Sequence, residues 1–568
     1  MVKRLASELA QEIRNSLSTL VQRGEFPNVA FPDFDLRPPR HAEYGDFASN
    51  VALQLTRGLR RNPLEIAEAI SHELNQRVSW AQASATAPGF LNFTVQDDFI
   101  RDQLREMLNR KEEYFRLDLG QGKRAQVEFV SANPTGPLTI GRTRGAVIGD
   151  TMARVFALAG YTVEREYYFN NAGKQMENLG NSLLLRYQEA LGDSVSIPED
   201  QEWFYHGEYL MDFAKQMVEE HGRGWTAENT HAFARLAEEQ MFEWIRNSLA
   251  SIQISHDVYF NERSLYDNEA IWETLTEMEA AGHTYRAAQR GGEQPSDPAQ
   301  LPATWLRSSQ LETNVEDQIL VRSNGEPTYT LTDIAYHRDK FARGFDILVN
   351  VLGVDHQSEA RVVKSGLRAL GICPDRLHVL FNQMVRAVVD GVEMKMSTRK
   401  GVFDTLDDLV ERTSADAIRY HMLARSHHSH LDFDVERVVQ QSNENPVYYI
   451  QNAHVRCAGI HREAAQRGLH MEGADLSLLG KTELDFLRRA LALGDQIEQV
   501  LERMIPHRVA FFALELATAF HPVYEEVRVL NESIDEETAR ARLAFYLGVQ
   551  QIFKALLGLM GMSAPERM

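Results

Sequence analysis

The chain has 568 residues, of which 43% are hydrophobic and 25% charged, a composition typical of a globular protein with roughly three or four domains. Its two cysteines, Cys373 and Cys457, lie far apart, which excludes a disulfide framework and a cysteine-rich zinc site. No apolar run approaches the ~20 residues of a membrane span, and the start of the chain reads as a charged amphipathic helix, not a signal peptide, so we expect a cytoplasmic protein.

The formal net charge of -21 argues at first against a nucleic-acid partner. The acidity is local, however. Residues 201–300 hold 7 basic and 18 acidic residues, a net charge of -11, whereas residues 1–110 and 441–568 carry -1 and -4. The two ends of the chain are therefore still open to an RNA partner.

Residues 1–115 mix helical patterns with a strand-like stretch at 89–95, which predicts a small α+β domain. A β-rich run at 125–131 follows and is closed by the turn signal NPTGP. A helical stretch at about 141–159 and a second strand-like run at 162–169 complete a βαβ unit. This spacing predicts a parallel, nucleotide-binding sheet.

Residues 116–440 are predicted to form the domain built on this sheet. Its acidic, mostly helical segment at about 195–310 reads as an insertion between two halves of the sheet, which resumes with strand-like runs at 317–323 and 346–354. Residues 441–568 show helical periodicity throughout and predict a helical bundle.

The first candidate for chemistry is the segment from Asn133 to Gly149. Gly141, Gly145 and Gly149 recur every four residues, so they share one helical face that something approaches closely. A helix N-terminus carries partial positive charge, and Arg142 and Arg144 add full charges, which suits a triphosphate. Tight packing of this helix on its sheet explains the glycines equally well.

The second candidate is the sequence KMSTRKG at 395–401. Three cations and a glycine in one loop could stabilise phosphates that gain negative charge in a transition state. Alone this signal is weak, because most charge runs are solvated surface.

Together the two segments resemble the signature pair of class I aminoacyl-tRNA synthetases. The chain as a whole resembles arginyl-tRNA synthetases, with matching stretches in the same order from end to end. The matching stretches are GFLNF near 90, VEFVSANPTGPL at 127–138, REYYFNNAG at 165–173, PTYTLTDIAYH at 327–337, KMSTRKG at 395–401, HLDFDVERVVQQSNENPVYYIQNAHVR at 430–456 and the closing SAPERM.

The resemblance implies a multidomain α/β protein with a Rossmann-like catalytic domain, a largely helical insertion, a small N-terminal α+β domain and an all-α C-terminal bundle. It also implies an arginine–tRNA ligase that uses ATP with Mg2+, acts on tRNA and L-arginine, and works as a monomer without a protein-ligated metal. For arginine, it implies that Glu128 and Asp333 hold the guanidinium beside Tyr329, while Ser131 and Asn133 hold the backbone amine and carboxylate. Planar carboxylates suit a guanidinium, although a lone glutamate in VEFV is more commonly an outward-facing strand residue.

For the nucleotide, the resemblance implies an ATP-binding set and a catalytic set of residues. The ATP-binding set is Gly136, Gly141, Gly145, Asp355, His356 and Met396. The catalytic set is Thr139, Arg142, Lys395, Ser397, Arg399 and Lys400. The alternative for the pair at 355–356 is a plain strand-end turn.

Three positions depart from the family pattern. The family's first signature has histidines where this chain has Thr139 and Arg142, and the usual second lysine of the KMS loop is Thr398. Our hypothesis is that the permanent charge of Arg142, with Arg399 and Lys400 beyond Thr398, replaces the missing groups. The alternative is a catalytically weakened paralogue that binds tRNA or arginine as a regulator.

The resemblance implies that the C-terminal bundle binds the anticodon stem-loop, where aromatic side chains stack on unpaired bases. The candidates there are Tyr449, Asn452 and Met568, and we expect the neighbouring Tyr448 to be buried. Asn92 and Phe93 are candidates for the tRNA corner, with strand packing as an equally good explanation. The segment 416–419 is predicted to be structural and to join the catalytic domain to the bundle.

Overall fold

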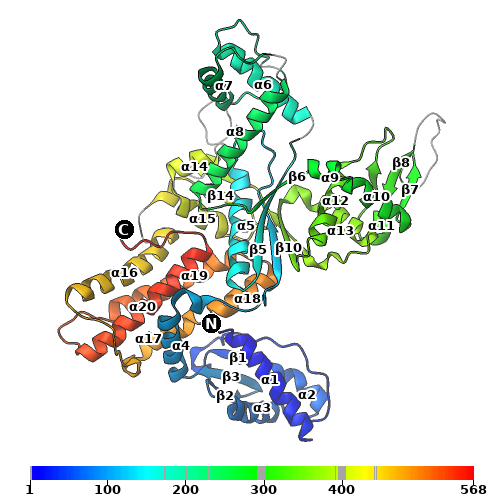
Figure 1. Ribbon diagram of the computed structural model, residues 1–568. Helices are drawn as coiled ribbons and strands as arrows, with labels where there is room; N and C mark the ends of the chain where they lie inside the picture. The colour runs from blue at the N-terminus through cyan, green and yellow to red at the C-terminus, as the bar shows by residue number, and fades with distance from the viewer. Residues whose placement is uncertain are drawn as a thin grey trace.

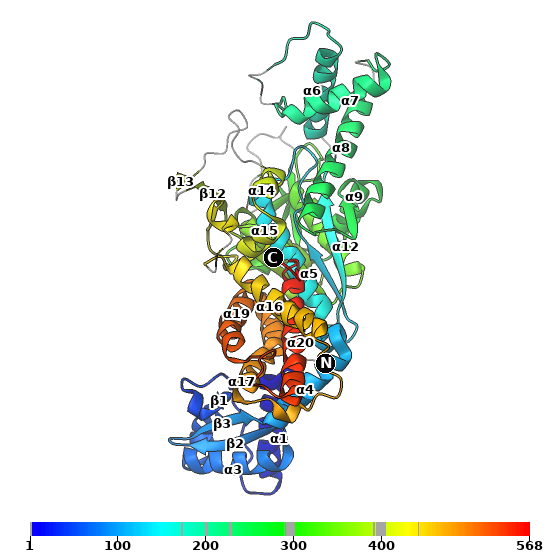
Figure 2. The same cartoon turned by 90° about the vertical axis from the view of Figure 1, so that its left-hand side faces the viewer.

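The computed structural model is an elongated molecule in which the N-terminal domain lies at one end and a helical bundle lies between it and the central sheet (Figures 1 and 2). Two further units extend from the sheet at the other end (Figures 1 and 2). The structure describes residues 3–171, 174–198, 201, 203–226, 230–288, 290, 302–389, 392–393, 405–440, 442 and 444–568.

The N-terminal domain is a three-stranded antiparallel sheet covered by helices, in the order β1-β3-β2. Asn62 starts one of these helices, because its side chain accepts a hydrogen bond from the N–H of Leu64 and Pro63 fixes the first turn. The α+β prediction is confirmed. The elements are α1 (Leu5–Gln22), β1 (Phe47–Ser49), α2 (Val51–Leu59), α3 (Pro63–Arg77), β2 (Ala81–Thr86) and β3 (Phe90–Val95).

The central sheet has five parallel strands in the order β11-β10-β4-β5-β6. Consecutive strands run outward from β4 on one side, and β10 and β11 lie on the other, so the order reverses between β4 and β10. In open parallel sheets, ligands bind at the carboxyl ends of the strands at this point. The bounds are β4 (Arg124–Glu128), α5 (Ile140–Leu158), β5 (Thr162–Phe169), β6 (Val258–Asn261), β10 (Ile347–Gly353), α13 (Gln357–Ala369) and β11 (Leu377–Asn382).

The predicted single insertion at 195–310 is wrong in one respect, since β6 lies inside it and forms an edge of the central sheet. Helices before β6 form one protruding unit, and a second unit follows β6 (Figure 1). The first unit contains α6 (Lys174–Ala190), α7 (Glu208–His221) and α8 (Thr230–Ser251). The second contains α9 (Arg263–Asp267), α10 (Ala270–Ala280), β7 (Thr284–Ala287), β8 (Ala303–Leu306), α11 (Ser308–Leu311), β9 (Gln318–Val321) and α12 (Tyr329–Ala342).

The predicted strand at 317–323 exists as β9, but it does not resume the parallel sheet. It pairs antiparallel with β8 in the separate sheet β7-β8-β9. A third small sheet, β13-β12-β14, follows the central one. The elements of this region are β12 (Val385–Val389), β13 (Val392–Glu393), α14 (Leu406–Arg412), α15 (Ala415–Leu423) and β14 (Leu431–Asp434).

The helical bundle shares one continuous apolar core with the central sheet. Arg419 fixes this junction: it is fully buried, pairs with Asp150, and donates hydrogen bonds to the carbonyls of Ile252 (2.7 Å) and Met560 (2.5 Å). The prediction that 416–419 joins the two domains is therefore confirmed. The helices are α4 (Asp97–Arg110), α16 (Pro446–Gln466), α17 (Lys481–Ala490), α18 (Leu493–Arg503), α19 (His507–Glu526) and α20 (Glu536–Leu559). Short 3-10 turns are η1 (Ala42–Tyr44), η2 (Lys111–Phe115), η4 (Val354–His356), η5 (Pro374–Arg376), η6 (Arg437–Val439) and η7 (Leu476–Leu478).

The glycine stripe of α5 has two functions. A Cβ at Gly149 would lie 2.3 Å from the ring of Phe129, so this glycine permits the helix to pack on the sheet. At Gly145 the nearest atom would be the Asn382 Oδ1 at 3.6 Å, and at Gly141 it would be the Thr139 Oγ1 at 3.9 Å. Packing on the sheet therefore explains Gly149, whereas the described side chains leave room beside Gly141 and Gly145.

We predict that Gly149→Ala lowers the free energy of unfolding by about 1–3 kcal/mol, because the added methyl overpacks a filled contact. Gly141→Ala is the matched control, since it places the same methyl on the same helix face without a close neighbour. It should leave stability unchanged or raise it by up to about 1 kcal/mol. Denaturant unfolding of both variants measures the difference, and equal stabilities would contradict the packing role of Gly149.

Candidate active site

A cavity of about 540 Å³ opens at the carboxyl ends of β4 and β10, where the strand order reverses. Its lining combines residues from the strand ends with residues from α5, α12 and the turn after β6. The polar and charged side chains of this lining include Glu128, Ser131, Asn133, Arg142, Tyr168, Asn170, Lys174, Gln175, Glu262, Tyr329, Asp333, Tyr336, His337, Asn350, His356 and Glu359.

Glu128 is the last residue of β4 and is only 4% exposed. Its carboxylate accepts hydrogen bonds from Lys340 Nζ (2.5 Å) and Ser131 Oγ (2.9 Å), and Lys340 also donates to Asn350 Oδ1 (3.0 Å). Burial raises the pKa of Glu128, but the charge of Lys340 outweighs this effect and holds the pKa below its ordinary value. Glu128 is therefore an ionised, already paired group at the cavity floor.

Two further acids in the lining have no such partner. Neither Asp333 nor Glu262 forms an ion pair within the described part of the chain. Burial and, to a smaller extent, the nearby charges of other acids raise the pKa of Asp333 to about 8. Glu262, which is 5% exposed, accepts hydrogen bonds from the hydroxyl of Tyr168 (2.5 Å) and from Asn170 Nδ2 (2.7 Å).

Burial raises the pKa of Glu262 as well. Carboxylates gathered in this way repel one another, and a cation placed among them would lower the pKa of each. The cavity is thus prepared for a positively charged ligand that donates several hydrogen bonds. Glu262 is a site residue that the sequence analysis missed; it directly follows β6, whereas Glu128 is the last residue of β4.

The turn after β4 orients the polar lining. Val130 and Ser131 have left-handed φ angles of 70° and 43°, a strained conformation for residues other than glycine that costs of order 1–3 kcal/mol each. This turn aims Ser131 Oγ at Glu128 and lets it accept a hydrogen bond from the Tyr168 N–H (3.2 Å). Asn133 joins the same cluster, since its Oδ1 accepts from the Asn170 N–H (3.0 Å) and its Nδ2 donates to Gln175 (3.1 Å).

Tyr329 begins α12 at the cavity mouth and is 72% exposed, one helical turn before Asp333. The structure therefore brings together the five residues predicted to bind arginine in one cavity: Glu128, Ser131, Asn133, Tyr329 and Asp333.

The residues predicted to bind the nucleotide include those at the start of α5. Thr139 immediately precedes the helix, and the exposed Arg142 lines the cavity and donates a hydrogen bond to the carbonyl of Val130 (3.3 Å). Arg144 differs from our prediction. It is fully buried and donates to the carbonyls of Gln383, Ser426 and Ser429, so its charge is unavailable to a ligand.

At the end of β10, His356 reaches the cavity, pairs through Nδ1 with Glu359, and lies 3.6 Å from Asp355 through Nε2. Asp355 itself is exposed and is absent from the lining. Gly136 lies in the loop before α5, where an added Cβ would meet only the hydroxyl of Tyr209 at 3.8 Å. The other predicted nucleotide contacts lie outside the described residues: Lys395, Met396, Ser397, Arg399 and Lys400, together with Thr398.

The comparisons with known proteins agree along the whole chain. Residues 103–442 match the family described as "tRNA synthetases class I (R), catalytic domain", residues 7–95 match "Arginyl tRNA synthetase N terminal domain", and residues 450–568 match "DALR anticodon binding domain". The chain belongs to the arginyl-tRNA synthetase family.

Among curated relatives, the chain is 37% identical over 577 residues to the arginine–tRNA ligase of Desulforamulus reducens and 38% identical over 576 residues to that of Carboxydothermus hydrogenoformans, with 100% of both chains covered in each case. A solved structure of a putative arginyl-tRNA synthetase from Campylobacter jejuni is 32% identical, with a TM-score of 0.74 over 84% of this chain and 100% of that chain. The Thermus thermophilus arginyl-tRNA synthetase, at 19% identity, has the same fold, with a TM-score of 0.74 over 99% of this chain and 100% of that chain.

In the helical bundle, Tyr449 lies on α16 and packs its ring against His521 of α19, with ring centroids 4.1 Å apart. Together with Arg456, Pro522 and Glu525, these rings line a shallow cavity of about 330 Å³. Asn452 lies one turn further along α16 and is half-buried, and Met568 is 58% exposed. Tyr448, which we expected to be buried, is half-buried like Asn452.

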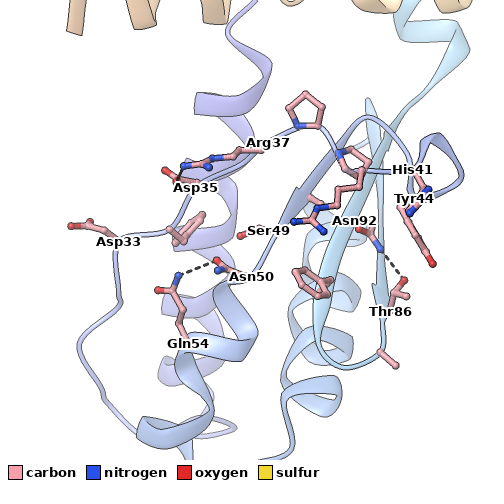
Figure 3. A pocket seen from close by; sticks show the side chains of 17 residues that line it. Asp33, Asp35, Arg37, His41, Tyr44, Ser49, Asn50, Gln54, Thr86 and Asn92 are labelled. Carbon is pink, nitrogen blue, oxygen red and sulfur yellow. Dashed lines mark hydrogen bonds and ion pairs between the residues drawn. The ribbon is translucent and has the colours of Figure 1, made fainter. Parts of the chain in front are cut away.

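In the N-terminal domain, the side chains of Asn92 and Phe93 lie in different surroundings. Asn92 lines a cavity of about 1020 Å³ together with the loop residues at 37–41, and its side chain donates to the hydroxyl of Thr86 (2.8 Å), as Figure 3 shows. Phe93 is 1% exposed and belongs to the domain core, so strand packing explains it and we do not retain it as an RNA contact.

No group of three or more His, Cys, Asp or Glu side chains is placed to hold a metal ion in the described part of the chain. None of the helices described is both long enough and apolar enough to span a membrane.

Proposed function

We propose that this chain is an arginine–tRNA ligase. The carboxylate of arginine attacks the α-phosphorus of ATP, pyrophosphate leaves, and arginyl-adenylate forms. The terminal adenosine hydroxyl of tRNA then attacks the activated carbonyl, which gives arginyl-tRNA and releases AMP. Both steps depend on positioning and on stabilisation of developing charge, without a covalent enzyme intermediate.

The observation that carries this proposal is the set of acids in the cavity. Asp333 and Glu262 have no cationic partner among the described residues, and Asp333 holds a raised pKa of about 8. A guanidinium presents five donors in one plane and is the cation best matched to several converging carboxylates. Arginine would supply both the charge and the hydrogen bonds that this cavity lacks.

The rest of the site divides between the two substrates. Ser131 and Asn133 lie where they can orient the backbone end of arginine, while the start of α5 with Thr139 and Arg142 supports the ATP phosphates. Mg2+ would enter with ATP, held by the triphosphate and not by a dedicated protein cage. We extend the proposal to the bundle and the N-terminal domain as tRNA-binding surfaces, and to a cytoplasmic monomer.

Pyrophosphate release tests this function directly. The purified chain, with arginine, ATP, Mg2+ and a matched tRNA, should release pyrophosphate and form arginyl-tRNA, and lysine should not replace arginine. Omitting tRNA shows whether adenylate formation waits for the partner. Tight tRNA binding with no turnover at all would instead favour a regulatory paralogue, the alternative that Thr139, Arg142 and Thr398 raise.

The raised pKa of Asp333 predicts a pH dependence of arginine binding. Because arginine pairs with the carboxylate form, binding between pH 6 and 8 must release a proton, and affinity should rise by up to about 10-fold per pH unit until it levels off near pH 8. Calorimetry in buffers of different ionisation enthalpy measures the released proton. A dissociation constant that stays constant from pH 6 to 8 would contradict the assignment.

A further inference from the structure

The helical unit α6–α8 contacts the first signature segment of the catalytic domain and the start of α14, which follows the second signature segment in the sequence. Figure 1 shows α8 running from the outer helices down to the side of the sheet, where its last turns meet α14. From this unit, Tyr209 of α7 and Trp244 of α8 extend toward the nucleotide side. Neither residue lines the arginine cavity.

Tyr209 holds the first signature segment. Its hydroxyl donates a hydrogen bond to the carbonyl of Thr135 (3.1 Å), directly before Gly136 in the loop that leads into α5. The phenol ring is half-buried and packs against Trp244, with ring centroids 5.5 Å apart and planes at 67°. Such an edge-to-face contact adds about 0.5–1.5 kcal/mol beyond the buried area of the rings.

Trp244 holds the chain that follows the second signature segment. Its Nε1 donates to Asp407 Oδ2 (2.6 Å), and Ser248 Oγ donates to the same oxygen (2.8 Å). Asp407 lies in the first turn of α14, six residues after Gly401. A carboxylate that accepts two charge-assisted hydrogen bonds at one oxygen is firmly oriented.

The segment before α5 and the segment before α14 are also hydrogen-bonded to each other. Thr139 and Thr405 form an isolated β-bridge, and the N–H of Leu406 donates to the carbonyl of Leu138 (2.8 Å). Thr405 and Asp408 then close a capping box that fixes the start of α14. The start of α14 is thus hydrogen-bonded to the residues just before α5. The helical unit contacts both of these segments, through Tyr209 on one side and Trp244 on the other.

We propose that Tyr209 and Trp244 are positioning residues for the ATP site. They hold the loop before α5 in register with the start of α14, so the helical unit fixes the position of the helix start that supports the triphosphate. This inference rests on the proposed function in that ATP is the molecule bound. It gives a role to the helical unit α6–α8, which contains none of the residues predicted to bind arginine or ATP.

Tyr209→Phe and Trp244→Phe test this proposal, because each removes one hydrogen-bond donor and retains an aromatic ring. Each should raise the KM for ATP by about 3- to 10-fold, the effect of one lost hydrogen bond, while the KM for arginine and the affinity for tRNA stay within about twofold. The double variant should show less than the product of the two effects, since both changes break one connection.

Two matched variants serve as controls. Tyr187→Phe removes the same kind of bond within the same unit, since the Tyr187 hydroxyl donates to the carbonyl of Gly222 far from both segments. Trp272→Phe removes an indole from the exposed side of α10. Both should leave the KM for ATP unchanged, even where the melting temperature falls.

Binding of ATP alone, measured by calorimetry, separates this inference from the proposed function. A wild-type chain that forms no arginyl-tRNA would overturn the function, whereas a 3- to 10-fold weaker ATP affinity of the two variants would still support the positioning role. ATP constants equal to those of the controls, or equal rises in the KM values for ATP and arginine, would overturn the positioning role.

Discussion

Asp333→Asn should lower kcat/KM for arginine by about 100-fold or more, with the KM for ATP nearly unchanged. Removing one partner of a buried charge pair costs about 2–5 kcal/mol, which corresponds to a factor of about 30 to several thousand. We expect Asp333 to contribute most to this recognition, because Lys340 already pairs with Glu128, whereas Asp333 has a raised pKa of about 8 that a cationic ligand would lower.

Charge selectivity distinguishes this effect from a folding defect. Citrulline carries a neutral ureido group in the shape of a guanidinium, so the wild type should reject it strongly. Asp333→Asn should reduce the ratio of arginine to citrulline use, because the substitution removes the charge and retains the shape. The rate of pyrophosphate exchange with each amino acid, with matched tRNA present, measures that ratio.

Asp339→Asn is the control on the same helix. Asp339 pairs with Arg343 (2.9 Å) and does not line the cavity. It should retain wild-type selectivity even if stability falls. An unchanged preference for arginine in Asp333→Asn would remove Asp333 from the arginine site, and Glu262→Gln would then become the leading test.

The sequence predicted the parts of the fold whose patterns are long. The strands β4, β5 and β10 lie in β-rich runs, and a helical stretch separates the first two, so the parallel sheet was predicted from them. Glu128 and Asp333 are 205 positions apart in the sequence, and the resemblance, not the pattern, brought them into one site. The cavity confirms that they are neighbours.

The sequence did not reveal very short strands or the direction in which each arginine of α5 points. The four residues of β6 are too few to show a period, so the strand and the acid that follows it, Glu262, remained hidden in the acidic segment. Arg142 and Arg144 are two positions apart on a helix, and a helix turns by about 200° over two residues, so one faces the cavity and the other the protein interior. Composition alone assigned both to the triphosphate.

Arg142→Ala should lower the kcat of arginylation by about 10²- to 10³-fold, the usual effect of losing one group that stabilises charge in a transition state. Arg142 is the cation that this structure places at the cavity from the start of α5, because Arg144 is buried against three carbonyls. Where the family has histidines, Thr139 offers one hydrogen bond, and Arg142 offers a guanidinium charge.

Conservative variants decide whether the charge or its geometry matters. Arg142→Lys keeps the charge and should recover most of the lost rate, whereas Arg142→His should restore activity mainly below about pH 7, where imidazole is protonated. Arg361→Ala, which removes an exposed arginine from α13, should leave the rate unchanged. Normal arginylation by Arg142→Ala would refute the compensation hypothesis. It would mean that the start of α5 contributes through its backbone N–H groups and that the cations of residues 395–400 carry the phosphate chemistry.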